Sequence, residues 1–261
     1  MADQPNNALF AHERRQEIVS RARQTGRVAV TELAHALAVT SETIRRDLSQ
    51  LEQAGLLRRV HGGALPVERH TLEPEVLERA LEMVSEKRRI AERAVDELPI
   101  DGTIFLDAGT TTGVLADVLP AGRTLTVVTH SLSIALTLAG RPGYTVLTPG
   151  GEVRGATLAT VGPWAEGRLR GIQTDVAFIA TNGLSVARGL TTPNVVEAEV
   201  KRLIIQTARR VVLLADHTKI NRDYFECFGA LGDIDLLISD GAIDVAAIHE
   251  LDAAGLATVL V

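Results

Sequence analysis

Apolar residues recur at helical spacing in three short segments near the start of the chain. In the third segment, Ile44, Leu48 and Leu51 fall at positions i, i+4 and i+7, so one face of the helix is apolar and packs inward. A short apolar stretch and a pair of glycines follow, which indicates a strand that turns into a wing. The predicted elements are helices over residues 12–24, 31–37 and 41–54 and a strand over residues 56–60.

The helical pattern then stops, and two prolines, Pro66 and Pro74, indicate a linker over residues 65–74. A charged amphipathic stretch over residues 75–98 again has helical spacing. We expect it to connect two domains or to pair with another subunit. The sequence therefore predicts a small domain over residues 1–64 and a larger one over residues 75–261.

After Gly102 the pattern changes to short apolar runs that alternate with helical segments. Such alternation is typical of an α/β fold in which helices cross over a parallel sheet. The expected strands are residues 103–106, 124–128, 144–147, 176–179, 211–214 and 236–238. The expected helices are residues 113–119, 132–139, 164–170, 196–208 and 245–254.

Composition agrees with this fold class, because 46% of the residues are apolar but only 3% are aromatic. Ala, Val, Leu and Ile must fill the core, as they do in parallel sheets covered by helices. No apolar run approaches the roughly 18 residues of a spanning helix, and the polar start is unlike a signal sequence, so we expect a cytoplasmic protein without membrane contact. The single cysteine, Cys227, excludes an internal disulfide and a cysteine-clustered zinc site, and we expect it to be buried. We expect no metal and no cofactor.

Charge is unevenly distributed along the chain, whose net charge is −6. Residues 1–64 hold nine arginines against seven acidic residues, a net of +2, whereas the remainder holds 18 basic against 26 acidic residues, a net of −8. The asymmetry is mild, but only the N-terminal piece suits DNA.

A helix that reads the major groove needs an apolar back, short polar residues near its N-terminus and cations directed at phosphates or guanine edges. The segment that begins at Ser41 has all three. The alternative is an arginine-rich face exposed only to solvent, and His61 is equally well explained as a solvent-facing turn residue. The candidate DNA contacts are Ser41, Thr43, Arg45, Arg46 and Ser49 on the helix and Arg58, Arg59 and His61 in the strand and wing.

Residues 14–64 strongly resemble the winged helix-turn-helix of DeoR-type transcriptional regulators. The resemblance implies that residues 31–37 form the supporting helix, residues 41–54 the recognition helix and residues 61–64 the wing. It rests on Gly26, Val30, Glu32 to Ala34, Val39, Thr40, Glu42 to Leu48, Leu51, Glu52, Gly55 and Arg59 to Ala64.

A glycine and three threonines lie between an apolar strand and a helix, in the segment Asp107, Ala108, Gly109, Thr110, Thr111 and Thr112. A helix N-terminus offers unpaired N–H groups and a partial positive charge, glycine lets the backbone approach, and the hydroxyls add donors, so the segment suits a phosphate. Threonines at a helix start are equally common as simple caps. The nucleotide P-loop is excluded, because no Gly-Lys-Ser/Thr follows.

Other predicted strands also end in polar residues or glycines, which would converge beyond the carboxyl edge of the sheet. Lys219 is the natural partner of an anion, although an ion pair with Asp216 is nearly as good an explanation. Glu197 and Lys201 are four residues apart and are explained as a helix-stabilising pair. The candidate effector-binding residues are Asp107, Gly109, Thr110, Thr111 and Thr112 with His130, Ser131, Gly151, Arg154, Gly183 and Lys219.

Residues 86–235 are similar to the sensor domain of the same DeoR-type family. One departure is His130, where such regulators more often have Asn. The resemblance implies a fold similar to ribose-5-phosphate isomerase, homo-oligomerisation as a dimer or tetramer, operator DNA as partner and a phosphorylated sugar or polyol as inducer, for example galactose-6-phosphate, fructose-1-phosphate or glycerol-3-phosphate. It rests on residues 107–112 and 129–131, Gly150, Gly151, Gly183, residues 189–192, Glu197, Lys201, Asp216 and Lys219.

The expected function is therefore a repressor of a carbohydrate operon, with no catalytic residues. One alternative is an enzyme like a sugar-phosphate isomerase fused to a DNA-binding head. Isomerisation needs a poised general base, and residues 180–185, where the resemblance would put the isomerase's acidic motif, contain no acid. A second alternative is a C-terminal domain that only oligomerises.

Overall fold

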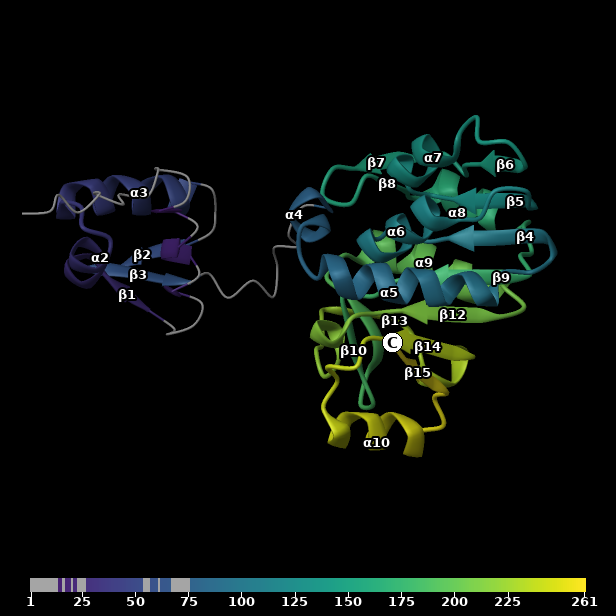
Figure 1. The fold of residues 1–261 in the computed structure, drawn as a ribbon. Coiled ribbons are helices and arrows are strands. Elements are labelled where there is room, and N and C mark those ends of the chain that lie inside the picture. Colours follow the sequence, from purple (N-terminus) through teal and green to yellow (C-terminus); the bar gives the residue numbers. More distant parts are fainter. Residues whose placement is uncertain are drawn as a thin grey trace, which may run out of the picture. The chain divides into compact units, whose positions relative to one another are not determined.

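The structure is a computed structural model that describes residues 14–15, 17–19, 21–22, 27–53, 57–60, 62–66 and 76–261. The chain forms two compact units, Met1–Arg69 and His70–Val261 (Figure 1). The division between them falls within the segment 65–74. Among the described residues, no helix is long and apolar enough to cross a membrane.

The N-terminal unit combines helices with a small antiparallel sheet. Helix α2 spans Val30–Ala36, helix α3 spans Ser41–Gln53, and the described residues between 14 and 22 are also helical. The sheet has the order β1-β3-β2, with β1 at Val28–Ala29, β2 at Leu57–Val60 and β3 at Gly63–Pro66. The described parts of the predicted helices, strand and wing are therefore present, and β1, with two residues, is too short to show a period in the sequence.

The predicted apolar stripe of α3 forms the centre of this unit. Ile44, Leu48 and Leu51 are all at least 96% buried. Asp47, between them, is also buried and accepts a hydrogen bond from Nε of Arg14 at 2.6 Å. This ion pair ties the first helical segment to α3, whereas Arg45 and Arg46 of α3 are exposed.

Two boundaries differ from the sequence prediction. Leu65 and Pro66 belong to β3 rather than to a linker, because Pro66 pairs with Leu57 at the end of the strand. The single helix predicted over residues 75–98 is two helices, α4 (Val76–Ala80) and α5 (Val84–Ala94), followed by a 3-10 turn at Val95–Glu97. The break lies at Met83, whose φ of +50° is left-handed and cannot continue a right-handed helix.

The larger unit is organised around a seven-stranded parallel sheet of order β15-β14-β12-β9-β4-β5-β6 (Figure 1). All six predicted strands are in it, and β15 is added at one edge. The strands are β4 (Asp101–Leu106), β5 (Thr124–Thr129), β6 (Tyr144–Leu147), β9 (Val176–Ile179), β12 (Val211–Leu214), β14 (Leu236–Ser239) and β15 (Thr258–Leu260).

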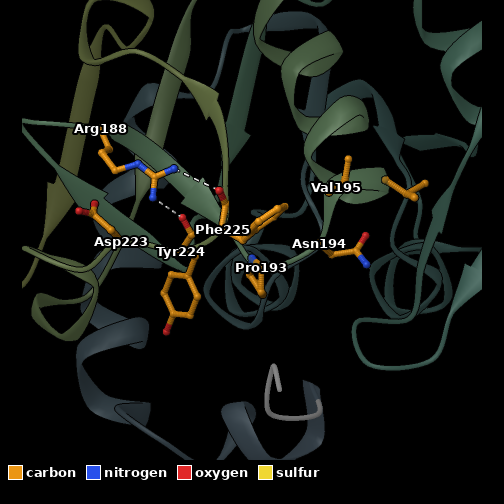
Figure 2. A pocket seen from close by; sticks show the side chains of 8 residues that line it. Arg188, Pro193, Asn194, Val195, Asp223, Tyr224 and Phe225 are labelled. Carbon is orange, nitrogen blue, oxygen red and sulfur yellow. Dashed lines mark hydrogen bonds between the residues drawn. The ribbon is translucent and has the colours of Figure 1, made fainter. Parts of the chain in front are cut away.

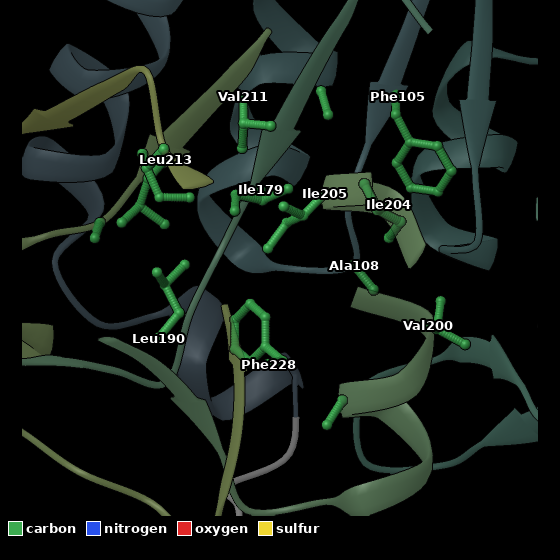
Figure 3. Packing of buried hydrophobic residues seen from close by; sticks show 14 of the residues in the cluster. Phe105, Ala108, Ile179, Leu190, Val200, Ile204, Ile205, Val211, Leu213 and Phe228 are labelled. Atoms are coloured by element: carbon green, nitrogen blue, oxygen red, sulfur yellow. The ribbon is translucent and has the colours of Figure 1, made fainter. Parts of the chain in front are cut away.

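Helices cover both faces of this sheet, and the side chains of each strand alternate between them. In β4, Ile104 and Leu106 pack in the core beneath α5 and α6, whereas Phe105 belongs to the core on the α8 and α9 side (Figure 3). The crossover helices are α6 (Thr110–Val118), α7 (Leu132–Leu138), α8 (Pro163–Leu169), α9 (Val195–Thr207) and α10 (Val245–Ala253).

Two smaller β structures that the sequence pattern did not predict complete the unit. A hairpin joins β7 (Glu152–Arg154) to β8 (Ala159–Val161), and a separate sheet has β11 (Gly189–Thr192) between β10 (Gly183–Ser185) and β13 (Glu226–Gly229). Cys227 lies in β13 and is exposed, so the expectation that it is buried was wrong. Side chains alternate along the strand, and it is the next residue, Phe228, that points into the core.

Candidate functional site

A small cavity of about 20 Å³ lies where three neighbouring strands of the parallel sheet end. Because β12, β9 and β4 are adjacent, the loops that follow them meet at the same edge of the sheet. Of the predicted effector residues, the cavity brings together Gly109, Thr110, Thr111 and Lys219. Its other lining residues are Arg79, Ala180, Thr181, Leu214, Ala215 and Asp216.

The threonine loop forms one wall of this cavity. Helix α6 begins at Thr110, so the N–H groups of its first turn have no acceptor within the helix. Thr112 points elsewhere, because its fully buried hydroxyl donates to the carbonyls of Asp107 at 2.7 Å and Gly109 at 3.0 Å. A Cβ on Gly109 would lie 2.7 Å from that of Ala180, so only glycine allows the two loops to approach this closely. The loop thus presents a helix N-terminus and two threonines to the cavity.

Asp216 and Lys219 form the facing wall, after β12. Asp216 is 1% exposed, and its Oδ1 accepts the backbone N–H of Thr218 at 3.0 Å. Its Oδ2 has no hydrogen-bond partner among the described residues and lies 3.9 Å from Nζ of Lys219. This separation is at the outer limit of an ion pair, so both charges remain able to bind other groups.

Asp107 lies directly before the threonine loop but is bonded within the protein. It is fully buried, its Oδ1 accepts the N–H of Ala108 at 2.9 Å, and its Oδ2 accepts the N–H of Ala180 at 2.9 Å and a bond from Nζ of Lys201. Burial raises the pKa of Asp107, but the charge of Lys201 and the hydrogen bond from His130 outweigh it and lower that pKa from 3.8 to about 2. The ionised carboxylate therefore fixes the loop after β4 to the loop after β9.

His130 is part of the same buried network and does not line the cavity. Its Nδ1 lies 3.2 Å from the carbonyl oxygen of Thr160, and its Nε2 lies 2.9 Å from Oδ1 of Asp107. Ser131, the next residue, caps α7 by accepting the N–H of Ile134 at 3.4 Å.

The remaining predicted effector residues also lie outside the cavity. Arg154 donates to Oε2 of Glu197 at 2.9 Å. Gly151 and Gly183 are packed against backbone, since a Cβ would lie 2.5 Å from the carbonyl oxygen of Val161 and 2.2 Å from that of Arg222. The structure therefore does not bring all the polar strand ends into one pocket.

Lys201 has a larger role than the sequence interpretation gave it. Its Nζ is 4.0 Å from Oε1 of Glu197, the partner expected from their spacing, but it also donates to Asp107 and to the carbonyl of Ala180. The apolar residues around Lys201 in the sequence of α9 could have indicated that this lysine is buried. Ala198, Val200, Ile204 and Ile205 are buried on several sides of the helix, so a lysine among them needs a buried counter-ion.

The candidate DNA-binding residues lie on α3 and β2. Arg45 and Arg46 are exposed, and Arg45 forms only an exposed contact with Glu42 at 3.2 Å. Thr43 is hydrogen-bonded to Thr40 before the helix. Arg59 of β2 donates to Oγ of Ser49 at 2.8 Å, which links the strand to the recognition face. Ser41 is half-buried at the start of α3, and the side chain of Arg58 and the whole of His61 lie outside the described residues.

A larger groove of about 680 Å³ lies beside the start of α9, away from the threonine loop (Figure 2). Arg188 donates there to the carbonyls of Tyr224 at 2.7 Å and Phe225 at 3.1 Å. Those bonds engage its guanidinium within the protein, and no predicted site residue lines the groove. Its lining residues are Arg188, Pro193, Asn194, Val195, Val196, Asp223, Tyr224 and Phe225.

Comparisons with known proteins find similarity along most of the chain. The model of the DeoR-like helix-turn-helix domain matches residues 14–70, and that of the DeoR C terminal sensor domain matches residues 82–241. The HTH-type transcriptional regulator GlpR of Haloferax volcanii is 40% identical over 251 residues, 96% of this chain and 98% of that protein. The glycerol-3-phosphate regulon repressor of Escherichia coli is 29% identical over 92% of this chain and 94% of that protein. The solved ribose 5 phosphate isomerase A from Neisseria gonorrhoeae has a TM-score of 0.38 and 18% identity, over 51% of this chain and 52% of that one.

Proposed function

Because the chain belongs to the DeoR family of DNA-binding transcriptional regulators, we propose that it represses an operon of sugar or polyol metabolism and leaves its operator when a phosphorylated sugar or polyol binds. Both family resemblances drawn from the sequence are confirmed. The similar Escherichia coli protein is named as a repressor of a glycerol-3-phosphate regulon, which supports repression and a phosphorylated effector here. An operator-binding protein acts where the DNA is, so we place it in the cytoplasm.

The observation that carries the effector proposal is the cavity at the threonine loop. The N-terminus of α6 and Lys219 both line it, and both favour a phosphate. Oδ2 of Asp216 is a buried acceptor without a hydrogen bond among the described residues, which suits a sugar or polyol hydroxyl. We therefore assign Gly109, Thr110, Thr111 and Lys219 to the phosphate and Asp216 to a hydroxyl.

On the DNA side we assign base and phosphate contacts to α3 and β2. Arg45 and Arg46 are exposed on the helix that the family resemblance makes the recognition helix, and Arg59 is exposed on the neighbouring strand. A bidentate arginine contact to guanine contributes about 1–3 kcal/mol of base discrimination.

We further propose that the sensor domains associate as a dimer or tetramer and hold two DNA-binding units at the spacing of two half-sites. An effector that binds better to a different arrangement of the pair then lowers operator affinity. Coupling of about 1–3 kcal/mol is typical of such systems and corresponds to roughly 5- to 150-fold in affinity.

An isomerase-like activity is the second candidate, favoured by one observation. Asp216 is a buried carboxylate beside a lysine, which is the arrangement of a general base. We favour regulation because the family is one of regulators. Purified protein that converts ribose-5-phosphate to its ketose would overturn this choice.

The direct test is operator release. Full-length protein bound to its operator fragment is titrated with galactose-6-phosphate, fructose-1-phosphate and glycerol-3-phosphate, with the unphosphorylated compounds as controls. At least one phosphorylated compound should lower operator affinity by 5-fold or more, and its unphosphorylated form should not. Operator affinity that no compound of a broad sugar-phosphate panel changes would exclude the proposed effector class.

A further inference from the structure

Arg79 lines the cavity but does not belong to the parallel sheet or to a loop that follows one of its strands. It lies on α4, the short helix that begins directly after the segment between the two units, whereas the other lining residues lie at or after the ends of β4, β9 and β12. Arginine has a planar guanidinium that binds phosphate through two parallel hydrogen bonds, so its place in the same cavity as the threonine loop suits a phosphate.

Charges of both signs lie around Lys87, whose Nζ is hydrogen-bonded to the backbone of Arg79. Lys87 is buried in α5, and burial lowers its pKa, with smaller contributions from Asp216, Lys219, Glu82 and Arg79. Two other cations, Arg79 and Lys219, and two carboxylates, Asp216 and Glu82, are therefore close enough to Lys87 to act on its charge. An added phosphate would place negative charge between Arg79, Lys219 and the N-terminus of α6.

Hydrogen bonds hold both ends of α4, which also packs against α6. Nζ of Lys87 donates to the carbonyl oxygens of Arg79 and Glu82, at 2.5 and 2.7 Å, and the N–H of Val76 donates to the carbonyl of Ala156 at 2.8 Å. By contrast, the walls formed after β4 and β9 are joined by the buried Asp107 and Lys201. The wall formed by α4 is not part of this buried ion pair, and we take it to be the wall that moves.

We propose that Arg79 is a phosphate-binding residue of the effector site, which makes the helix after the interdomain segment part of the ligand's own binding site; this rests on the proposed function. The cavity of about 20 Å³ holds about one water, whereas sites for small ligands typically have about 300–1,000 Å³. Binding must therefore displace a wall. If α4 moves, the start of the chain segment that leads to the DNA-binding unit moves with it, because α4 begins directly after that segment.

The test measures phosphate binding separately from operator release. Full-length wild-type protein, Arg79→Gln, Arg79→Lys and the control Arg88→Gln are titrated by calorimetry with inorganic phosphate, galactose-6-phosphate, fructose-1-phosphate and glycerol-3-phosphate at constant ionic strength. Arg88 is exposed on α5 and pairs with Glu92 at 2.5 Å, so its replacement removes the same charge away from the cavity. Affinity for the tightest probe should fall about tenfold in Arg79→Gln, or about 1.4 kcal/mol, less in Arg79→Lys and not in Arg88→Gln.

Each outcome bears on the proposal. Equal affinity of Arg79→Gln and wild type overturns it and leaves the proposed function intact if operator release still occurs. If Arg79→Gln loses affinity for the probes but the wild type does not leave its operator when they bind, Arg79 is a phosphate-binding residue and the proposed function is contradicted. Absence of binding to wild type across the broad sugar-phosphate panel, these probes included, overturns both. Should Arg79→Gln fail to fold, a crystal of wild type with phosphate decides, because the guanidinium must lie within about 3.2 Å of a phosphate oxygen.

Discussion

Asp107 is the residue whose role in the tertiary structure differs most from the role that the sequence pattern predicts. The motif places it beside a phosphate loop, but its two oxygens are bonded to Ala108, Ala180 and Lys201. An ionised carboxylate and ammonium that are both buried are stabilised mainly by each other. We therefore expect Asp107 to act on the effector through the position of the loop.

Asp107→Asn should lower the free energy of unfolding at pH 7 by about 3–5 kcal/mol, because Lys201 would be left buried without its charged partner. Urea denaturation of wild type and variant measures the change. The control is Asp117→Asn, an exposed acidic residue on α6, which should change stability little. Equal stability of Asp107→Asn and wild type would contradict the buried ion pair.

The same residue predicts a dependence on pH. Its pKa is lowered from 3.8 to about 2 in the folded protein, so the folded state binds fewer protons than the unfolded state between these values. The contribution to stability, about 2 kcal/mol, is complete above about pH 4 and is lost as the pH falls toward about 2. The stability difference between wild type and Asp107→Asn should therefore shrink between pH 4 and pH 2; a constant difference would contradict a depressed pKa.

Thr111 lines the cavity and is 5% exposed, so its hydroxyl is one of the few protein groups that an effector there would meet. Thr111→Ala removes one hydroxyl donor and should weaken effector binding by about 0.5–1.5 kcal/mol, or roughly 2- to 13-fold. Operator affinity without effector should be unchanged. Calorimetry and an operator-binding assay measure the two, with Thr145→Ala, exposed on β6, as control. An unaltered effector affinity would remove Thr111 from the site.

At the scale of elements, α3 shows how much periodicity alone predicts. The apolar spacing correctly predicts which face is buried, and helix geometry then places Arg45 and Arg46 on the exposed side. The same reasoning was wrong over residues 75–98, where the apolar spacing continues across the break at Met83. The spacing of apolar side chains does not indicate that one residue, Met83, has a left-handed φ angle.

Arg46→Ala should reduce operator affinity by about 1–3 kcal/mol, because the variant loses either a base contact or a phosphate contact of α3. Effector affinity should not change. Fluorescence anisotropy over a range of salt concentrations distinguishes the two roles, since loss of a phosphate contact lowers the salt slope by about one. Arg89→Ala, exposed on α5, removes the same charge from the other unit. Wild-type operator affinity in Arg46→Ala would exclude it from the DNA interface.

At the scale of the whole molecule, two binding sites on separate units must influence each other through the chain between them. Linkage requires the influence to be reciprocal, whatever the path. If an effector lowers operator affinity by a given factor, saturating operator DNA should lower effector affinity by the same factor. Calorimetric titration of the effector into free and operator-bound protein tests this, and an effector affinity that DNA does not change would contradict linkage.

The sequence by itself determined the fold class, the six central strands, the helices between them and the family. Each depends on local periodicity or on a run of adjacent residues, which are properties of a linear chain. Only the tertiary structure decided which polar strand ends meet. Gly109, Thr110, Thr111 and Lys219 adjoin because β4, β9 and β12 are neighbours, whereas His130 and Arg154 are bonded within the protein. The position of Arg79 depends on a break in a helix and on contacts between residues distant in sequence, and neither leaves a period in the sequence.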